Sequence, residues 1–194
     1  MHFLSSRDRK AVVGLVGLLL AGVVAGGGPG WSQQTDSGQS LAAWDRIAQV
    51  LRHPRCLNCH QLDRPLQGDS RRAHIPPVVR GLDNLGEGTM RCRNCHNWTG
   101  NNEMAGVPGA PNWQLAPASM RWEGLSTGDL CRMLKNEELN GKRTPAKIVE
   151  HIATDALVLW AWQPGGRRTR VQIAHQDFVN LLKVWAAGGA ACPQ

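Results

Sequence analysis

The sequence predicts a mostly α-helical fold with extensive coil. Apolar residues recur at helical spacing at positions 41–52, at two places within 126–152, and at 174–187. No stretch of any length alternates apolar and polar residues, as a half-exposed strand does. Residues 61–90 and 97–118 are interrupted repeatedly by Pro and Gly, and we expect them to be loops.

The N-terminal residues 1–31 are typical of an export signal. Arg7, Arg9 and Lys10 precede an apolar run at 11–25, and a Gly-rich stretch follows. The run is shorter than the roughly 20 residues that span a bilayer. We therefore expect a periplasmic protein with a cleaved signal, and an uncleaved inner-membrane anchor is the alternative because no clean cleavage site follows. Residues 32–40 are rich in Gly, Ser and Gln, which predicts a flexible linker.

The first helix is expected over 41–52, with Ser40 as its cap. Trp44, Ile47 and Leu51 would lie on its apolar face. Pro54 should prevent the helix from continuing.

Three helix patterns follow in the C-terminal third. Ser126 and Asp129 have the spacing of a capping box. Thr144 and Pro145 are typical of a cap and first helical residue. The clearest apolar stripe lies at 174–187, and Gly188 should end that helix.

A five-residue pattern, C-x-x-C-H, occurs twice. Its copies are Cys56-Leu57-Asn58-Cys59-His60 and Cys92-Arg93-Asn94-Cys95-His96. On a helical turn the two thiols and the histidine share a face. The thiols can then reach the two vinyl groups at one edge of a porphyrin, and the histidine lies beneath the iron. We therefore predict that residues 41–194 form a small dihaem cytochrome c domain organised around two covalently attached haems, with His60 and His96 as the proximal iron ligands. The alternative is one zinc site made by the four cysteines.

Each iron would need a sixth ligand, and His or Met is the usual source. His74 lies in the loop between the motifs, where it could cross over a porphyrin. His151 lies within a predicted helix, and Met120 follows a Pro-rich loop. We rank His74 first, then His151, Met120 and Met90. Four further residues are less suited by position: His53, Met104, Met133 and His175.

Two cysteines lie outside the motifs, Cys131 and Cys192. In an oxidising compartment such a pair usually forms a disulfide, and we predict one here. Two separate buried thiols are the alternative.

The chain is basic, with a net charge of +7 from 22 Lys and Arg against 15 Asp and Glu. The basic residues are scattered rather than gathered in one stretch, and an exported protein rarely meets nucleic acid. Pairing of several Arg with haem carboxylates is the better explanation, because a planar guanidinium matches a carboxylate.

Further stretches accompany the two motifs. They are Arg64-Pro65-Leu66-Gln67-Gly68-Asp69, Met90-Arg91-Cys92, Gly106-Val107-Pro108-Gly109-Ala110-Pro111, Trp122-Glu123-Gly124-Leu125, Glu150-His151 and Gly189-Ala190-Ala191-Cys192-Pro193. On these stretches, from about Leu51 to Cys192, the chain resembles small exported dihaem cytochromes labelled as subunits of isoquinoline 1-oxidoreductase. The resemblance implies a redox partner, a periplasmic molybdenum hydroxylase that oxidises aldehydes or N-heterocycles. It also implies a downstream cytochrome or oxidase as electron acceptor.

The function predicted from the sequence is electron transfer rather than catalysis. The alternative is a small dihaem enzyme such as a peroxidase, which needs one iron with an open sixth position. The chain is short for the two-lobed form of that enzyme.

Overall fold

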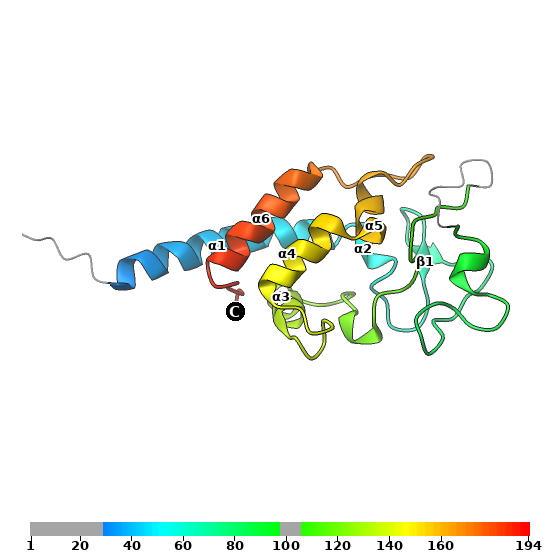
Figure 1. Ribbon diagram of the computed structural model, residues 1–194, viewed down its shortest axis with the longest axis horizontal. Coiled ribbons are helices and arrows are strands. Elements are labelled where there is room, and N and C mark those ends of the chain that lie inside the picture. The colour runs from blue at the N-terminus through cyan, green and yellow to red at the C-terminus, as the bar shows by residue number, and fades with distance from the viewer. Residues whose placement is uncertain (1–28, 98–105) are drawn as a thin grey trace, which may run out of the picture.

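The computed structural model describes residues 29–97 and 106–194, and within them the prediction of a mostly helical fold with extensive coil is confirmed. The helices are α1 (Pro29–Leu51), α2 (Pro54–Leu57), α3 (Thr127–Lys135), α4 (Pro145–Thr154), α5 (Ala156–Leu159) and α6 (His175–Ala187), with 3₁₀ turns η1 (Cys92–Asn94), η2 (Ala118–Met120) and η3 (Trp160–Trp162). The strands β1 (Leu66–Gln67) and β2 (Arg72–Ala73) form a small antiparallel hairpin. The helices gather around α1 and α6, and the coil with the hairpin lies at the opposite end (Figure 1).

The hydrophobic core lies where α1 crosses α6, and α3 and α4 close it. Trp44 of α1 and Trp185 of α6 are fully buried, with ring centroids 5.3 Å apart. Phe178, Leu130 and Ile148 bring α6, α3 and α4 onto the same cluster. Burial of these side chains, at roughly 1.5–3 kcal/mol each, is the main force that assembles the helical end.

The predicted linker is wrong, because α1 extends back to Pro29 and residues 32–40 are helical. Ser40 is likewise not a cap. It is fully buried within α1, where its Oγ donates to the Trp185 carbonyl (2.8 Å) and accepts from the Ala191 amide (3.0 Å). These contacts hold the helical turn at Ser40 in place. The helix can then extend from this turn back toward Pro29, because each residue added to an existing helix gains a hydrogen bond.

Most of the predicted export signal, residues 1–28, lies outside the described residues, so that prediction stands as it was. Nowhere in 29–97 or 106–194 is a helix both long enough and apolar enough to cross a membrane.

The starts of α3 and α4 agree with their predicted caps. The Ser126 Oγ accepts from the Asp129 amide, and the Thr144 side chain accepts from the Lys147 amide. Helix α5 has no counterpart among the predicted helices, and its cap is Asp155.

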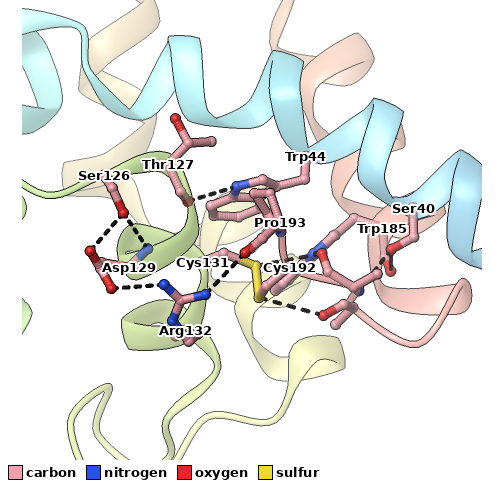
Figure 2. Close-up of a disulfide and its surroundings, with 12 residues drawn as sticks. Ser40, Trp44, Ser126, Thr127, Asp129, Cys131, Arg132, Trp185, Cys192 and Pro193 are labelled. Atoms are coloured by element: carbon pink, nitrogen blue, oxygen red, sulfur yellow. Dashed lines mark hydrogen bonds and ion pairs between the residues drawn. A yellow bond between two sulfur atoms is a disulfide. The ribbon is translucent and has the colours of Figure 1, made fainter.

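The predicted disulfide is confirmed: Cys131 of α3 is bonded to Cys192, with their Cα atoms 5.5 Å apart. Figure 2 shows how the C-terminal tail lies beside α3 and α1. The Trp185 indole donates to the Ala191 carbonyl (3.1 Å), and Arg132 donates to the Pro193 carbonyl (3.0 Å). The tail is thereby held by covalent and polar contacts together.

Gly38→Ala tests whether 32–40 is helical. Nothing lies within 4 Å of a Cβ built at Gly38, so alanine should stabilise the protein by about 0.5–1 kcal/mol through helix propensity. Urea unfolding measures the change. Gly188→Ala is the opposite control, because its Cβ would lie 2.4 Å from the Asp36 carbonyl oxygen, and it should destabilise. A neutral Gly38→Ala would argue for coil.

Replacing Cys131 and Cys192 together by Ser should lower the free energy of unfolding by about 4 kcal/mol, because the bridge closes a long loop in the unfolded chain. Their sequence separation is 61. Denaturant unfolding of the variant should match that of the reduced wild type. Equal stability of variant and oxidised wild type would contradict the bond.

Candidate functional site

The first motif lies on α2 and the turn after it. The His53 ring caps this helix by accepting from the Arg55 amide (3.2 Å). The amides of Cys59 and His60 both donate to the Cys56 carbonyl, at 3.2 and 3.1 Å. This turn places the two thiols and the imidazole on one face, as the spacing predicts.

The second motif forms the same kind of turn on η1. The amides of Cys95 and His96 donate to the Cys92 carbonyl, at 3.2 and 2.9 Å. The two motifs therefore have the same main-chain hydrogen bonds, although one lies on an α-helical turn and the other on a 3₁₀ turn.

The asparagine third in each motif anchors a flanking loop. Asn58 Nδ2 donates to the Gly68 carbonyl (2.9 Å), and Asn94 Nδ2 donates to the Thr89 carbonyl (2.8 Å). The repeated Asn in the sequence thus has a repeated structural role.

Both motif histidines have one ring nitrogen bonded to the main chain. His60 Nδ1 lies 2.7 Å from the Met120 carbonyl oxygen, and His96 Nδ1 lies 2.6 Å from that of Pro108. A carbonyl oxygen only accepts, so in the neutral rings the proton is assigned to Nδ1. Each Nε2 then has the lone pair that binds a metal ion.

A tryptophan stacks on each of these rings. His60 and Trp122 have centroids 3.3 Å apart and planes at 14°, and His96 and Trp113 have centroids 4.4 Å apart and planes at 7°. Neither stacking partner was expected from the sequence. They lie at unequal distances beyond their histidines, so no spacing could have identified them.

Two cavities lie beside the motifs. The helical cavity, about 290 Å³, lies among α2, α4, α5 and α6 and is lined by Cys56, Cys59, His60, Met120, His151 and Asp155, among others. The loop cavity, about 410 Å³, is lined by the coil end, including His74, Met90, Cys92, Cys95, His96 and Pro108. Both approach or lie within the size range of small-molecule sites, about 300–1,000 Å³.

His74 lies close to His96 in the loop cavity, with ring centroids 6.0 Å apart and ring planes at 63°. Two imidazoles bonded to one metal ion from opposite sides, each at about 2 Å, have ring centres about 6 Å apart. His74 Nδ1 is 2.8 Å from the Pro76 carbonyl oxygen, so its Nε2 is again the nitrogen left to bind. The separation and the tautomers suit a shared metal ion between the rings.

His151 shares the helical cavity with His60. His151 Nδ1 lies 3.3 Å from Asp155 Oδ2, an arrangement common behind metal-binding imidazoles. Met120 is also in this cavity and almost completely buried. Its carbonyl oxygen, however, bonds His60 Nδ1 rather than facing the free Nε2.

The less suited candidates have other contacts. His53 caps α2, and Met133 packs against the core. His175 is half-buried, and its Nε2 is bonded to the Ile152 carbonyl (2.9 Å). Met104 lies outside the described residues.

The electrostatics of the first motif favour neutral groups. Burial lowers the pKa of His60 to about 3, against a smaller opposing effect of its bond to Met120. Burial, and then the Cys59 thiol, raises the pKa of Cys56 to about 12, and burial raises that of Cys59 to about 11. Reactive thiols have lowered pKa values, so a thiol-exchange role fits poorly, whereas a neutral imidazole suits a metal ligand.

The four motif thiols are not joined in disulfides. Across the described part of the chain, no three His, Cys, Asp or Glu side chains are grouped to hold a metal ion. A four-cysteine zinc site needs such a group, so the zinc alternative finds no support in the geometry.

No protein-family model matches this chain, and no curated protein or solved structure matches it either. The residues of the two cavities are therefore the basis for a function.

Proposed function

We propose that this protein binds two haem groups covalently and transfers electrons. Cys56 and Cys59 would attach one haem in the helical cavity, with His60 as proximal ligand. Cys92, Cys95 and His96 would do the same in the loop cavity. The observation that carries the proposal is the bond from each motif Nδ1 to a main-chain carbonyl, which leaves a neutral Nε2 in a cavity that both thiols of its motif line.

His74 is the distal ligand proposed for the loop cavity. Its 6.0 Å separation from His96 supports this assignment, as does the Pro76 carbonyl that orients its ring. A His/His pair is expected to have a lower potential than a His/Met pair.

His151 is the distal ligand proposed for the helical cavity, ahead of Met120. The Asp155 carboxylate can hold the Nδ1 proton of His151 and make the ring a stronger donor. The Met120 carbonyl instead bonds His60 Nδ1. Its side chain therefore begins on the same side of the proposed haem as His60, whereas a distal ligand must come from the opposite side.

A second histidine at each site, His151 with His60 and His74 with His96, would favour a carrier over an enzyme. A bound haem supplies one-electron chemistry. The residues here would hold the ring from both faces, exclude water with Trp113 and Trp122, and leave no open coordination position. Little would rearrange when an electron arrives or leaves, and a peroxidase would need the opposite.

The proposed setting is the periplasm, supported by the export-signal pattern and by the disulfide. The proposed electron donor is a molybdenum hydroxylase of the isoquinoline or aldehyde oxidoreductase type. The proposed acceptor is a downstream cytochrome or oxidase. Both partners rest on the resemblance of the sequence.

Protein produced with a haem-attaching export system should carry two covalent haems per chain. Intact-mass spectrometry of the denatured protein measures the added mass, and a stain for covalent haem identifies it. Cys92→Ala with Cys95→Ala should leave one haem, and the matched change at Cys56 and Cys59 should leave the other. Bound zinc without haem in the wild type would overturn the proposal.

His74→Ala and His151→Ala should each convert a different haem to the high-spin form while both haems stay attached. Visible spectra and carbon monoxide binding measure the change, at about half of the total haem in each variant. Met120→Leu should leave the spectrum low-spin, and a high-spin haem there would assign Met120 instead of His151. A wild type that is half high-spin and consumes peroxide would favour the enzyme.

A further inference from the structure

The two cavities meet at a buried cation. Arg55 lines both of them, together with Cys59, Gln114, Leu115 and Trp160. Its side chain is only 2 % exposed, and its guanidinium lies 5.6 Å from the centroid of the Trp160 ring. A single charge is therefore enclosed in the wall between the two sites.

The charge of Arg55 is incompletely neutralised. Its Nη2 pairs with Asp69 Oδ1, but the Asp69 side chain is 42 % exposed. The other Asp69 oxygen accepts from the amide and hydroxyl of Thr169, at 3.1 and 2.7 Å. The Nε of Arg55 is buried and has no hydrogen-bond partner among the described residues.

A buried, unpaired N–H on a cation is costly, so such groups are normally matched by an anion. Thr169 and the solvent already share the one carboxylate that Arg55 contacts. Haem has carboxylates of its own, and they would enter the cavities with the porphyrin. A haem carboxylate would be the anionic hydrogen-bond acceptor that the Arg55 Nε–H has no partner to provide.

The position of Arg55 also bears on both irons. A positive charge stabilises an added electron nearby, and the interaction is stronger in a poorly solvated wall than at the surface. Because Arg55 belongs to both cavities, its effect should reach both sites.

We propose that Arg55 is the shared cation of the two haem sites: it donates its free Nε–H to a haem carboxylate and raises the reduction potential of both irons. The inference rests on the proposed function, and it adds a residue that sets the two potentials together.

Arg55→Gln is the direct test, by spectroscopic redox titration of the purified dihaem protein. Both midpoint potentials should fall, with the ratio of reduced to oxidised haem at a fixed potential changing at least tenfold, about 59 mV for one electron. Arg55→Lys keeps the charge and should hold both ratios within threefold of wild type. A shift at one haem or none, or an equal shift in Arg55→Lys, would overturn the proposal.

Three arginines serve as matched controls. Arg143 lines the helical cavity alone and Arg168 the loop cavity alone, so replacing either by Gln should lower one potential and not the other. Arg46 is exposed on α1 and lines neither cavity. Arg46→Gln should change neither reduction potential. If both potentials fall in this variant, the net charge of the protein and not the position of Arg55 would explain the effect of Arg55→Gln.

Asp69→Asn should change the two potentials in the opposite direction. It replaces an exposed carboxylate rather than a buried cation. Removing this negative charge should raise both potentials, by at least threefold in the reduced-to-oxidised ratio. If Arg55→Gln fails to fold, this variant decides, and unchanged potentials would overturn the inference. A wild type without haem would instead overturn the proposed function, so the two failures are distinguishable.

Discussion

The candidate site depends on one interaction made twice, the hydrogen bond from a motif histidine Nδ1 to a main-chain carbonyl. The acceptor for His60 is the carbonyl of Met120, 60 positions later in the chain, and the acceptor for His96 is that of Pro108, 12 positions later. Each bond sets a tautomer, orients a ring and fastens a loop over a cavity. Without this hydrogen bond the ring could rotate, and neither nitrogen would be fixed as the one that carries the proton.

The helical cavity owes its walls to the packing of α1 against α6. Ser40 joins α1 to the end of α6 and to the C-terminal tail, and the disulfide joins that tail to α3. Core residues Phe178 and Ile148 also line this cavity. Stability and site are therefore built from the same side chains, so damage to the core should also alter the cavity.

The loop cavity is held differently, because its walls have little regular structure. Arg80 connects the coil to the first motif region: its Nε donates to the Leu62 carbonyl (2.7 Å), and its Nη1 donates to Asn84 Oδ1 (2.6 Å). Arg91 pairs with Asp83 (2.6 Å) beside the second motif. Side-chain hydrogen bonds to loop atoms take the place of a helix ladder here.

The sequence by itself determined the local features: the two motif turns, the caps at Ser126 and Thr144, the irregular segments, and the cysteine pair. Each depends on residues close in the chain, or, for the disulfide, on a count of what remained. It misjudged Ser40 and residues 32–40, because their helix is stabilised by α6 and a tail more than 140 positions away. Only the tertiary structure decided which carbonyls hold His60 and His96, which tryptophans stack on them, that His74 lies close to His96, and that Arg55 lies between the cavities. Those contacts join distant segments of the chain, and their geometry depends on how the helices and loops pack, which no local spacing encodes.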